Sequence, residues 1–184
     1  MANEEFSLTT AQVAAQRQGY KYCPQCRTPM VDKFVFGRTR RVCPNEECHF
    51  VQFIDPKLTT AVMPLKGDKV LMVKRTMEPG RGSWCFPGGF METGETPQQC
   101  AIRECKEETG FDIEITGLID VFYYEDYRGS GVVIMFKGEV VGGEVALNPV
   151  ESEAVGFFAI DELPEPIAFE SNIQSLAAWR AGKI

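Results

Sequence analysis

The sequence predicts an α/β fold, in which a main domain with a mixed sheet follows a small cysteine-rich module. Three observations lead to this prediction. Segments rich in β-branched and aromatic residues indicate strands, and two segments with helical patterning flank them. Four of the seven cysteines fall within one short segment near the N-terminus, whereas the other three are scattered. Strands flanked by two helices are typical of a mixed sheet covered on both faces.

Length and composition set the size of these parts. The chain has 184 residues, 44% of them hydrophobic, which is enough for one good core and a small appendage. We expect an N-terminal tail over residues 1–19, the cysteine module over 20–55 and the main domain over 56–184. The tail is expected to be frayed or to form a short helix, and we assign it no function.

The formal net charge of -7 restricts the partners of the chain. Binding to nucleic acid or to an anionic membrane through charge alone needs a basic face, so we expect neither partner. A polyanionic substrate would need a bound cation. The N-terminus lacks the apolar core of a signal peptide, and no apolar run approaches the roughly 20 residues of a membrane span. We therefore expect a cytoplasmic protein, whose cysteines are metal ligands or free thiols rather than disulfides.

The cysteine module contains two closely spaced pairs, Cys23 with Cys26 and Cys43 with Cys48. The segment KFVFGRTRRV between them predicts a hairpin that turns at Gly37. Four thiolates presented by two tight turns can surround one tetrahedral Zn2+, which supplies folding free energy that so short a segment cannot obtain from a core. Unmetallated thiols or a disulfide pair are the alternatives.

Two further features of this module leave alternatives open. His49, the only histidine, directly follows Cys48 and could replace it as the fourth ligand, although we favour Cys48. The hairpin also carries three arginines that could contact phosphate, but we expect a solvated charged face. These arginines are Arg38, Arg40 and Arg41.

The main domain shows separate strand and helix patterns. Two β-rich runs flank a Lys-Gly-Asp turn and predict a β-hairpin. Later runs predict three more strands, and helical patterns occur before and after these three strands. In chain order, the expected elements are strands over 58–65 and 69–75, a helix over 97–109, strands over 112–124, 131–140 and 154–160, and a helix near 171–181.

The first of these helices has clear ends. Thr96 is a good N-cap, Pro97 suits the first helical position, and Gln99 completes the spacing of a capping box. Gly110 supplies a C-terminal stop. These signals predict a helix that ends at the residue before Gly110.

This helix concentrates negative charge on one side. At about 100° per residue, Glu104, Glu107 and Glu108 fall within an arc of roughly 100°. Like charges four residues apart cost about 0.2–0.5 kcal/mol, anions oppose the C-terminal end of the helix dipole, and Arg103 relieves only part of this cost. Clustered carboxylates instead suit Mg2+ or Mn2+, which would bridge them to substrate phosphates. The face that packs on the sheet is expected on the opposite side, at Ala101, Ile102 and Cys105.

The same helix carries a resemblance to a known family. The segment from Gly89 to Phe111 resembles the Nudix box, G-x5-E-x7-R-E-U-x-E-E-x-G-U, at every fixed position. Cys105 stands where an aliphatic residue is usual, but a buried cysteine acts as a small hydrophobe. Upstream, SWCFPGGF also resembles the family's approach to the box. The matching residues are Gly89, Glu95, Arg103, Glu104, Glu107, Glu108 and Gly110.

The resemblance implies a fold, an activity and a cofactor. The expected fold is a Nudix-type α/β/α sandwich, and the expected reaction is hydrolysis of a diphosphate bond in a nucleoside diphosphate derivative with divalent cations. Glu104, Glu107 and Glu108 are then ligands of Mg2+ or Mn2+, to which the Gly88 carbonyl adds another. Related enzymes are often homodimers, and the resemblance implies a homodimer here.

Further roles outside the metal ligands also follow from the resemblance. Glu95 with Arg103 is expected to orient the glutamate helix. Family members often draw a further base or ligand from a loop outside the box; Glu151 and Glu153 are the candidates, with a slight preference for Glu153. The aromatic residues that could stack on adenine or flavin are Phe86, Tyr123, Tyr124 and Tyr127, although most strand aromatics belong to the core.

A zinc ribbon followed by a Nudix domain is similar to the NADH, FAD and ADP-ribose pyrophosphatases. NADH pyrophosphatases carry an S-Q-P-W-P-F-P-type motif after the box, where this chain has VFYYEDYRGSGVVIMF. We therefore expect an ADP-linked substrate such as FAD or ADP-ribose, with AMP as a product. The alternatives are an NADH pyrophosphatase, or a regulator that senses nucleotides or binds nucleic acid through the cysteine module.

Overall fold

The computed structural model describes residues 19–126 and 129–184 of the chain. Almost all of the tail expected at residues 1–19, and Tyr127, lie outside the described residues. The described residues form two compact units. One contains those up to Pro56 with the described part of 125–130, and the other contains Lys57–Tyr124 and Gly131–Ile184. Within the described residues, no helix is long and apolar enough to cross a membrane.

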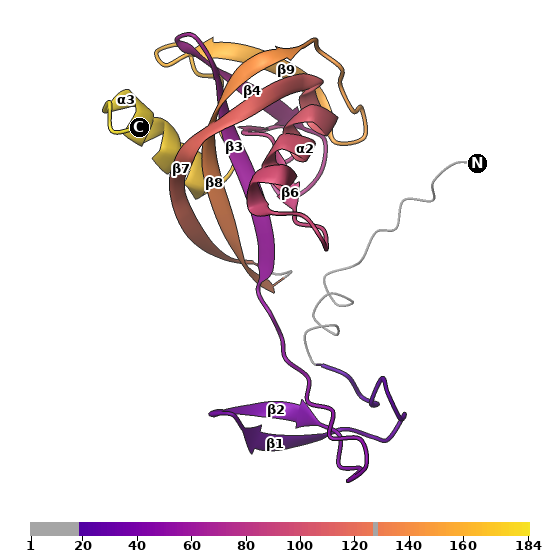
Figure 1. Ribbon diagram of the computed structural model, residues 1–184. Helices are drawn as coiled ribbons and strands as arrows, with labels where there is room; N and C mark the ends of the chain where they lie inside the picture. The colour runs from indigo at the N-terminus through magenta and orange to yellow at the C-terminus, as the bar shows by residue number, and fades with distance from the viewer. Residues whose placement is uncertain (1–18, 127–128) are drawn as a thin grey trace, which may run out of the picture. The chain divides into compact units, whose positions relative to one another are not determined.

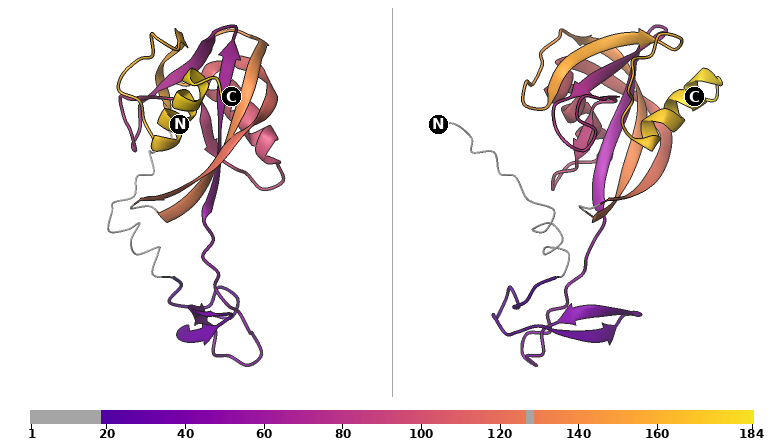
Figure 2. Two further views of the ribbon diagram at one scale, coloured as in Figure 1. Left: turned by 90° about the vertical axis from the view of Figure 1, so that its left-hand side faces the viewer. Right: turned by 180° about the vertical axis from the view of Figure 1, so that it is seen from behind.

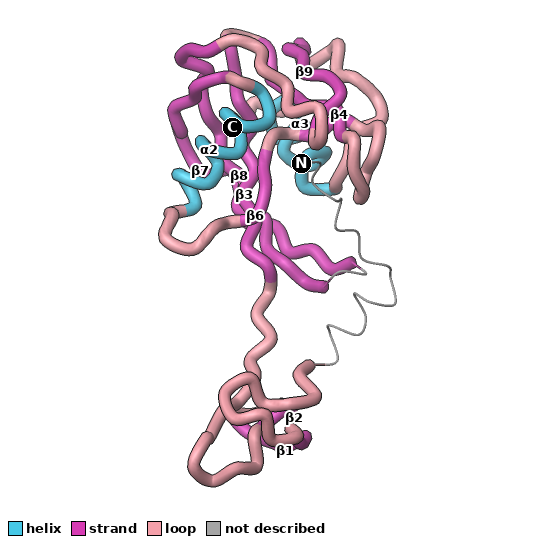
Figure 3. Tube along the Cα trace, turned by 90° about the vertical axis from the view of Figure 1, so that its right-hand side faces the viewer, coloured by secondary structure: helices cyan, strands magenta, loops and turns pink. Residues whose placement is uncertain are grey.

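The first unit is built on the predicted hairpin. Strand β1 (Val31–Val35) pairs antiparallel with β2 (Arg38–Val42). The two residues between them, Phe36 and Gly37, have φ values of 50° and 76°, as a two-residue hairpin turn requires. The hairpin that turns at Gly37 is therefore confirmed, and most of the unit around it is loop (Figure 3). Among the described residues of this unit, Cys23, Met30 and Cys43 form the buried core, and Cys26, Cys48 and Phe50 pack against it partly buried.

The second unit contains a seven-stranded sheet and two helices (Figure 1). The strands are β3 (Lys57–Lys66), β4 (Lys69–Arg75), β5 (Trp84–Cys85), β6 (Gly88–Phe90), β7 (Phe111–Asp126), β8 (Gly129–Gly143) and β9 (Ser152–Ala159), and the helices are α2 (Pro97–Thr109) and α3 (Glu170–Arg180). The central order is β5-β4-β3-β8-β7, with β6 paired to β3 and β9 paired to β4. Because β3 is antiparallel to β4 and parallel to β8, the sheet is mixed as predicted.

The five strands and two helices expected in this domain are present, within a few residues of their predicted ends. The short strands β5 and β6 are not predicted by the sequence. They have two and three residues, and β6 begins with two glycines, so neither carries a periodic pattern.

Alternation along β3 assigns the two faces of the sheet to the two helices. Val62 packs in one core cluster with Ala101 and Cys105 of α2. The next residue, Met63, packs in the other cluster with Leu176 of α3. Since successive side chains of a strand point to opposite faces, α2 and α3 cover opposite faces, as Figure 2 shows. The predicted α/β/α sandwich is confirmed.

The ends of α2 are those that the sequence predicts. The Thr96 side chain accepts a hydrogen bond from the Gln99 N–H, and the Gln99 side chain accepts one from the Thr96 N–H. Gly110 ends the helix in a left-handed conformation with φ of 82°. The capping box and the glycine stop are therefore confirmed.

The buried face of α2 differs from the predicted one. Ile102 is 38% exposed, whereas Cys100 is fully buried and Glu108 is only 7% exposed. Glu108 follows Ala101 by seven residues, which is close to two helical turns, so both lie on the same side. The expectation that all three glutamates oppose the apolar face was therefore wrong for Glu108.

Candidate active site

Glu108 contacts the glycines of β6 from the buried side of α2. Its Oε2 accepts a hydrogen bond from the Gly88 N–H at 3.1 Å. Burial raises the pKa of Glu108 to about 8; the Gly88 N–H and the charge of Arg75 lower it, whereas the charges of Glu104 and Glu151 raise it. A carboxylate buried beside other carboxylates is a group that a bound cation stabilises.

Arg103 connects the other carboxylates of the helix. Its guanidinium forms ion pairs with Glu95, Glu104 and Glu107 at 2.8, 2.7 and 3.0 Å. It also donates a hydrogen bond to the Phe90 carbonyl at 3.3 Å, which ties α2 to the end of β6. Burial raises the pKa of Glu104, and Arg103 opposes this effect. Arg103 thus pairs with two of the three clustered glutamates and with the predicted helix-orienting residue.

Glu95 holds Arg103 through two parallel hydrogen bonds. Arg103 Nε and Nη2 donate to the two carboxylate oxygens at 3.1 and 2.8 Å. The Glu92 N–H donates to the same carboxylate at 2.7 Å. The hydrogen bonds from Arg103, followed by the one from the Glu92 N–H, lower the pKa of Glu95 to about 2.

This lowered pKa predicts a stability loss in acid. A depressed carboxyl pKa stabilises the fold fully above its unfolded value of about 4.3, and this contribution disappears as the pH falls through the folded value. We therefore expect the stability difference between the wild type and Glu95→Gln to shrink as the pH falls from about 5 to about 2. Urea unfolding midpoints at several pH values measure this difference. A difference that stays constant with pH contradicts the proposed contact.

Gly88 and Gly89 have no space for a side chain. A Cβ at Gly89 would lie 2.5 Å from the carboxylate carbon of Glu104. A Cβ at Gly88 would lie 2.3 Å from the Thr60 carbonyl oxygen and 2.7 Å from the Cα of Ala61. The missing side chain of Gly89 therefore lets the Glu104 carboxylate lie close to the backbone, and that of Gly88 lets strand β3 pack closely.

The two glycines predict opposite phenotypes for a matched pair of substitutions. Gly89→Ala displaces the flexible end of Glu104, so hydrolysis should fall by at least about 10-fold with little change in Tm, as a misplaced reacting group does. Gly88→Ala pushes against backbone of β3 and should destabilise the domain by at least about 2 kcal/mol. Thermal unfolding and a phosphate-release assay on both variants measure these effects. If Gly89→Ala and Gly88→Ala lower the stability equally, the distinct roles given to the two glycines are wrong.

The oxygen donors at this position fit a divalent cation. Glu104, Glu107, Glu108 and the Gly88 carbonyl offer only oxygen ligands, which Mg2+ and Mn2+ prefer. The burial of Glu108 near Glu104 also suits a cation, which would stabilise the charged form of both carboxylates. Glu104 and Glu107 point toward Arg103, and within the described residues the glutamate oxygens do not converge as the cysteine sulfurs do. Each of these two carboxylates gives one oxygen to Arg103, so a cation would compete with Arg103 for them.

The two downstream candidates occupy different surroundings. Glu153 forms an ion pair with Lys74 at 2.6 Å and is about half exposed. Glu151 accepts a hydrogen bond from Asn148 Nδ2 at 3.0 Å, and its charge raises the pKa values of Glu104 and Glu108. These electrostatic effects favour Glu151 as the carboxylate that accompanies the glutamate helix, rather than the preferred Glu153, which already has a lysine partner.

The four aromatic candidates do not form one group. Phe86 is 3% exposed and belongs to the core cluster beneath α3, so it cannot stack on a ligand as predicted. The Tyr124 ring lies over Gly131 of the next strand, with its hydroxyl 3.4 Å from Thr59 Oγ1. Tyr123, the neighbouring residue of β7, is 67% exposed. Tyr127 lies outside the described residues.

Two residues with buried or charged contacts around β5 and β6, Arg75 and Asn172, are not predicted from the sequence. Arg75 ends β4, donates to the Pro79 carbonyl at 2.8 Å and lowers the pKa of Glu108 through its charge. Asn172 of α3 is 2% exposed and accepts a hydrogen bond from the Phe86 N–H at 2.7 Å. Asn172 shares the buried face of α3 with the polar Ser175, so little in the sequence indicates its hydrogen bond, and Arg75 resembles any strand end.

The first unit contains a second candidate metal centre. The sulfurs of Cys23 and Cys48 are 3.5 Å apart, those of Cys26 and Cys43 are 3.4 Å apart, and all four lie within 4.8 Å of one another. Tetrahedral Zn2+ with Zn–S bonds of about 2.3 Å separates its sulfurs by about 3.8 Å, so the group fits zinc. Hydrogen bonding to Thr28 lowers the pKa of Cys26 to about 6, whereas burial raises the pKa of Cys43. For Cys48, a backbone hydrogen bond lowers the pKa, but burial and the neighbouring thiols raise it to about 12. Of these three thiols, Cys26 therefore most readily gives the thiolate that zinc needs.

Among the alternatives for this centre, the structure favours four cysteine ligands. Cys48 belongs to the converging group, whereas the adjacent His49 is exposed. All seven cysteines are free, so none of them is engaged in a disulfide.

Two glutamates of α2 thus lie against the two glycines of β6, and the arginine of α2 contacts the end of the same strand, in an α/β/α sandwich. Residues 55–179 match the model of the NUDIX domain. The chain therefore belongs to the Nudix family, and its second unit is a Nudix hydrolase domain.

Individual relatives agree with this assignment. The chain is 34% identical over 134 residues to the ADP-ribose pyrophosphatase of Methanocaldococcus jannaschii, which covers 71% of this chain and 78% of that protein. It is 29% identical over 166 residues to the NAD-capped RNA hydrolase NudC of Chromobacterium violaceum, but spans only 59% of that protein's length. The crystal structure of a NUDIX hydrolase from Nitrosomonas europaea matches with a TM-score of 0.77 and 30% identity, covering 89% of this chain and 94% of that one.

Proposed function

We propose that the chain is a divalent-metal-dependent pyrophosphohydrolase that cleaves the diphosphate bond of an ADP-linked nucleotide, such as ADP-ribose or FAD, and releases AMP. The observation that supports this most is the packing of Glu108 and Glu104 against Gly88 and Gly89. This packing gathers carboxylates beside backbone that carries no side chain, and oxygen donors of this kind are the ligands that Mg2+ and Mn2+ prefer.

In this proposal, Glu104, Glu107, Glu108 and the Gly88 carbonyl hold Mg2+ or Mn2+. When bound, the cation neutralises the diphosphate and activates water. Glu108 is fixed by the Gly88 N–H, so it keeps its position while the cation competes with Arg103 for the other two carboxylates. Because Glu95 retains Arg103 by two hydrogen bonds, release of Glu104 does not leave the guanidinium without a partner.

We further propose that Glu151 accepts the proton of the attacking water. Glu151→Gln should then lower kcat by roughly 100-fold, as the loss of a general base does. Glu153→Gln provides the matched control, since it is isosteric and only two residues away, and should retain kcat within about twofold of the wild type. Steady-state kinetics with each variant measure this. The reverse order of effects would assign the base to Glu153.

The preference for ADP-ribose or FAD rests on two kinds of support. The segment after the box lacks the motif expected for NADH pyrophosphatases. The relative at 34% identity is named an ADP-ribose pyrophosphatase, and the chain covers 78% of it. The relative named as an NAD-capped RNA hydrolase is less similar and longer, so an NAD-type substrate is the second candidate.

A substrate panel tests this function. Purified protein is incubated with ADP-ribose, FAD, NADH and diadenosine polyphosphates in Mg2+, in Mn2+ and in EDTA, and AMP is quantified by chromatography. We expect AMP from ADP-ribose or FAD with metal and none in EDTA. AMP release from NADH alone selects the second candidate. Tight nucleotide binding without any product would overturn hydrolysis and support a sensor.

For the first unit, we propose that residues 20–55 form a zinc ribbon with Cys23, Cys26, Cys43 and Cys48 as ligands. The unit has three residues in its buried core, which is too little apolar burial for independent folding. The converging sulfurs supply the alternative source of stability.

A further inference from the structure

The first unit differs in charge from the rest of the chain. Residues 20–55 contain six lysines and arginines and four acidic residues, whereas the remainder contains 13 and 22. Zn2+ with four thiolates carries a charge of -2, so it brings the unit close to neutrality. With a net charge near zero, the unit can attract an anion only where its positive charges are concentrated. Three of the six lysines and arginines lie on one strand, β2.

Within residues 19–126 and 129–184, two of the three arginines on β2 have no carboxylate partner. Arg41 pairs with Asp32 at 3.3 Å. Arg40 donates to backbone carbonyls of the hairpin, including that of Phe36 at 3.0 Å. Across the described part of the chain, Arg38 forms no ion pair and no side-chain hydrogen bond. The guanidinium charges of Arg38 and Arg40 are therefore available to an anion.

Exposed aromatic rings accompany these charges. The rings of Phe36 and Phe53 stack with centroids 6.0 Å apart and an angle of 29°, and the Arg40 guanidinium lies 5.0 Å from the centroid of Phe53. Phe36 and Phe53 are 74% and 54% exposed within the structure. Phe34 pairs with Thr39 and therefore lies on the opposite face of the hairpin from the two arginines beside Thr39. The two stacked rings beside Arg40 form an apolar surface that a partner would cover.

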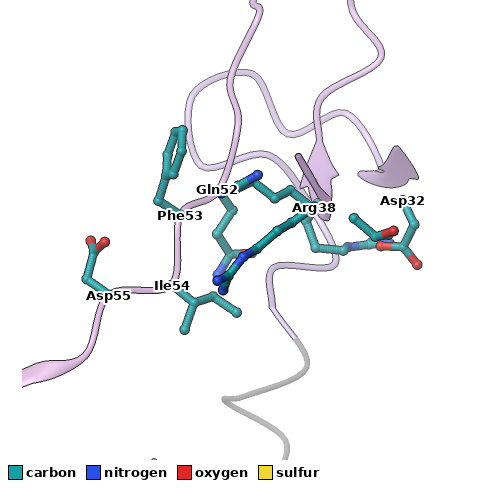
Figure 4. Close-up of a pocket in the computed structure, with 9 residues that line it drawn as sticks. Asp32, Arg38, Gln52, Phe53, Ile54 and Asp55 are labelled. Atoms are coloured by element: carbon teal, nitrogen blue, oxygen red, sulfur yellow. The ribbon is translucent and has the colours of Figure 1, made fainter. Parts of the chain in front are cut away.

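A hollow joins the arginines to the segment that follows the second cysteine pair (Figure 4). Arg38 and Asp32 come from the hairpin, and Gln52, Phe53, Ile54 and Asp55 come from this segment. All residues that line the hollow belong to the first unit. Polar groups, an unpaired arginine and an aromatic ring thus meet at one position.

We propose that this surface, the hairpin face formed by Phe36, Arg38, Arg40 and Phe53, binds single-stranded nucleic acid. Arginines with free charge contact phosphates, and exposed aromatic rings stack with unpaired bases, which is the combination that single-strand-binding proteins use. A duplex hides the faces of its bases and gains only the phosphate contacts. The inference is independent of the proposed hydrolysis.

Charge and aromatic content argue against other partners for the hairpin face. An acidic peptide would pair with the arginines but leave the exposed rings of Phe36 and Phe53 without flat partners. A second copy placed symmetrically would bury the aromatic rings, but it would also bring Arg38 and Arg40 of the two copies together. Single-stranded nucleic acid satisfies both kinds of group.

Fluorescence anisotropy tests the proposal on the full-length zinc-loaded protein. The probes are a labelled 20-nucleotide RNA of mixed sequence, the DNA of the same sequence and the corresponding duplex. We expect both single strands to bind more tightly than the duplex, with affinity falling roughly sevenfold between 50 and 200 mM salt for two phosphate contacts. A preference for RNA over DNA would indicate that the 2′-hydroxyl is contacted.

Three variants separate this surface from general charge effects. Arg38→Glu and Phe36→Leu should each weaken single-strand binding at least about fivefold. Lys69→Glu changes the net charge as much as Arg38→Glu, but at an exposed position of β4 in the other unit, and should have little effect. Zinc content and circular dichroism confirm that each variant is folded.

Several results would overturn the proposal. These are the absence of binding at 50 mM salt, equal weakening by Arg38→Glu and Lys69→Glu, and equal affinity for duplex and single strand. Polyglutamate that displaces the RNA probe from the hairpin face as effectively as unlabelled RNA would indicate an acidic protein partner. A dimer in sedimentation velocity that dissociates with Phe36→Leu would indicate that a second copy covers the face.

Discussion

Glu108→Gln is expected to lower kcat for nucleotide hydrolysis by roughly 100- to 1,000-fold, the range seen when a group that stabilises developing charge is removed. The amide keeps the shape of the side chain and can still accept the Gly88 N–H bond, so the fold is retained. In the proposed mechanism, the substitution removes only the negative charge that Glu108 would offer to the cation. Steady-state AMP release with saturating Mg2+ measures the effect.

The same substitution should leave stability unchanged or raise it. The folded state binds a proton at Glu108 more tightly than the unfolded state does, because its pKa is raised to about 8. The charged side chain therefore costs stability as the pH rises from about 4 to about 8, and neutral glutamine does not. Glu114→Gln, on an exposed position of β7, is the control for both measurements. Loss of both activity and Tm in Glu108→Gln would indicate a purely structural glutamate.

Cys43→Ser is expected to abolish zinc binding and unfold residues 20–55 while the Nudix domain stays folded. Structural Zn2+ contributes roughly 10–16 kcal/mol of apparent binding free energy at neutral pH, and no core of comparable size replaces it here. Cys43 is 4% exposed, and its sulfur lies 3.4 Å from that of Cys26, so serine cannot replace it. Zinc content and limited proteolysis followed by mass spectrometry measure the result.

His49→Ala is the matched control for the cysteine substitution. His49 is adjacent to Cys48 but exposed, so its removal should leave one zinc per chain and the protease resistance of the unit. Zinc loss in His49→Ala with retention in a Cys48→Ser protein would make His49 the fourth ligand. Retention of zinc and protease resistance in Cys43→Ser would exclude the four-cysteine site.

Local signals predicted the fold well because they act over few residues. Thr96, Gln99 and Gly110 specify the ends of α2 through bonds to the backbone within four residues of each end. The turn at Gly37 needs a left-handed conformation that glycine adopts freely. The strands of the mixed sheet were visible as β-branched runs, whereas β5 and β6 depend on pairing with β4 and β3.

The candidate site was predicted in part, because its residues are set by tertiary packing. The position of Glu108 on the buried side of α2 follows from its seven-residue spacing from Ala101. A carboxylate is tolerated at this buried position because the Gly88 N–H donates a hydrogen bond to it. Phe86 looked like a ligand-stacking residue, yet it lies in the core under α3. The choice between Glu151 and Glu153 depends on where Lys74 lies, which nothing in the local sequence indicates.

Mn2+ binding measured by electron paramagnetic resonance in the presence of AMP tests the central claim, that the carboxylates of α2 hold the cation at which the diphosphate bond breaks. We predict that the zinc-loaded wild type binds Mn2+ and that Glu104→Gln, Glu107→Gln and Glu108→Gln each weaken this binding. Arg38→Glu in the first unit should bind Mn2+ as the wild type does. Undiminished Mn2+ binding by all three glutamine variants would contradict the account.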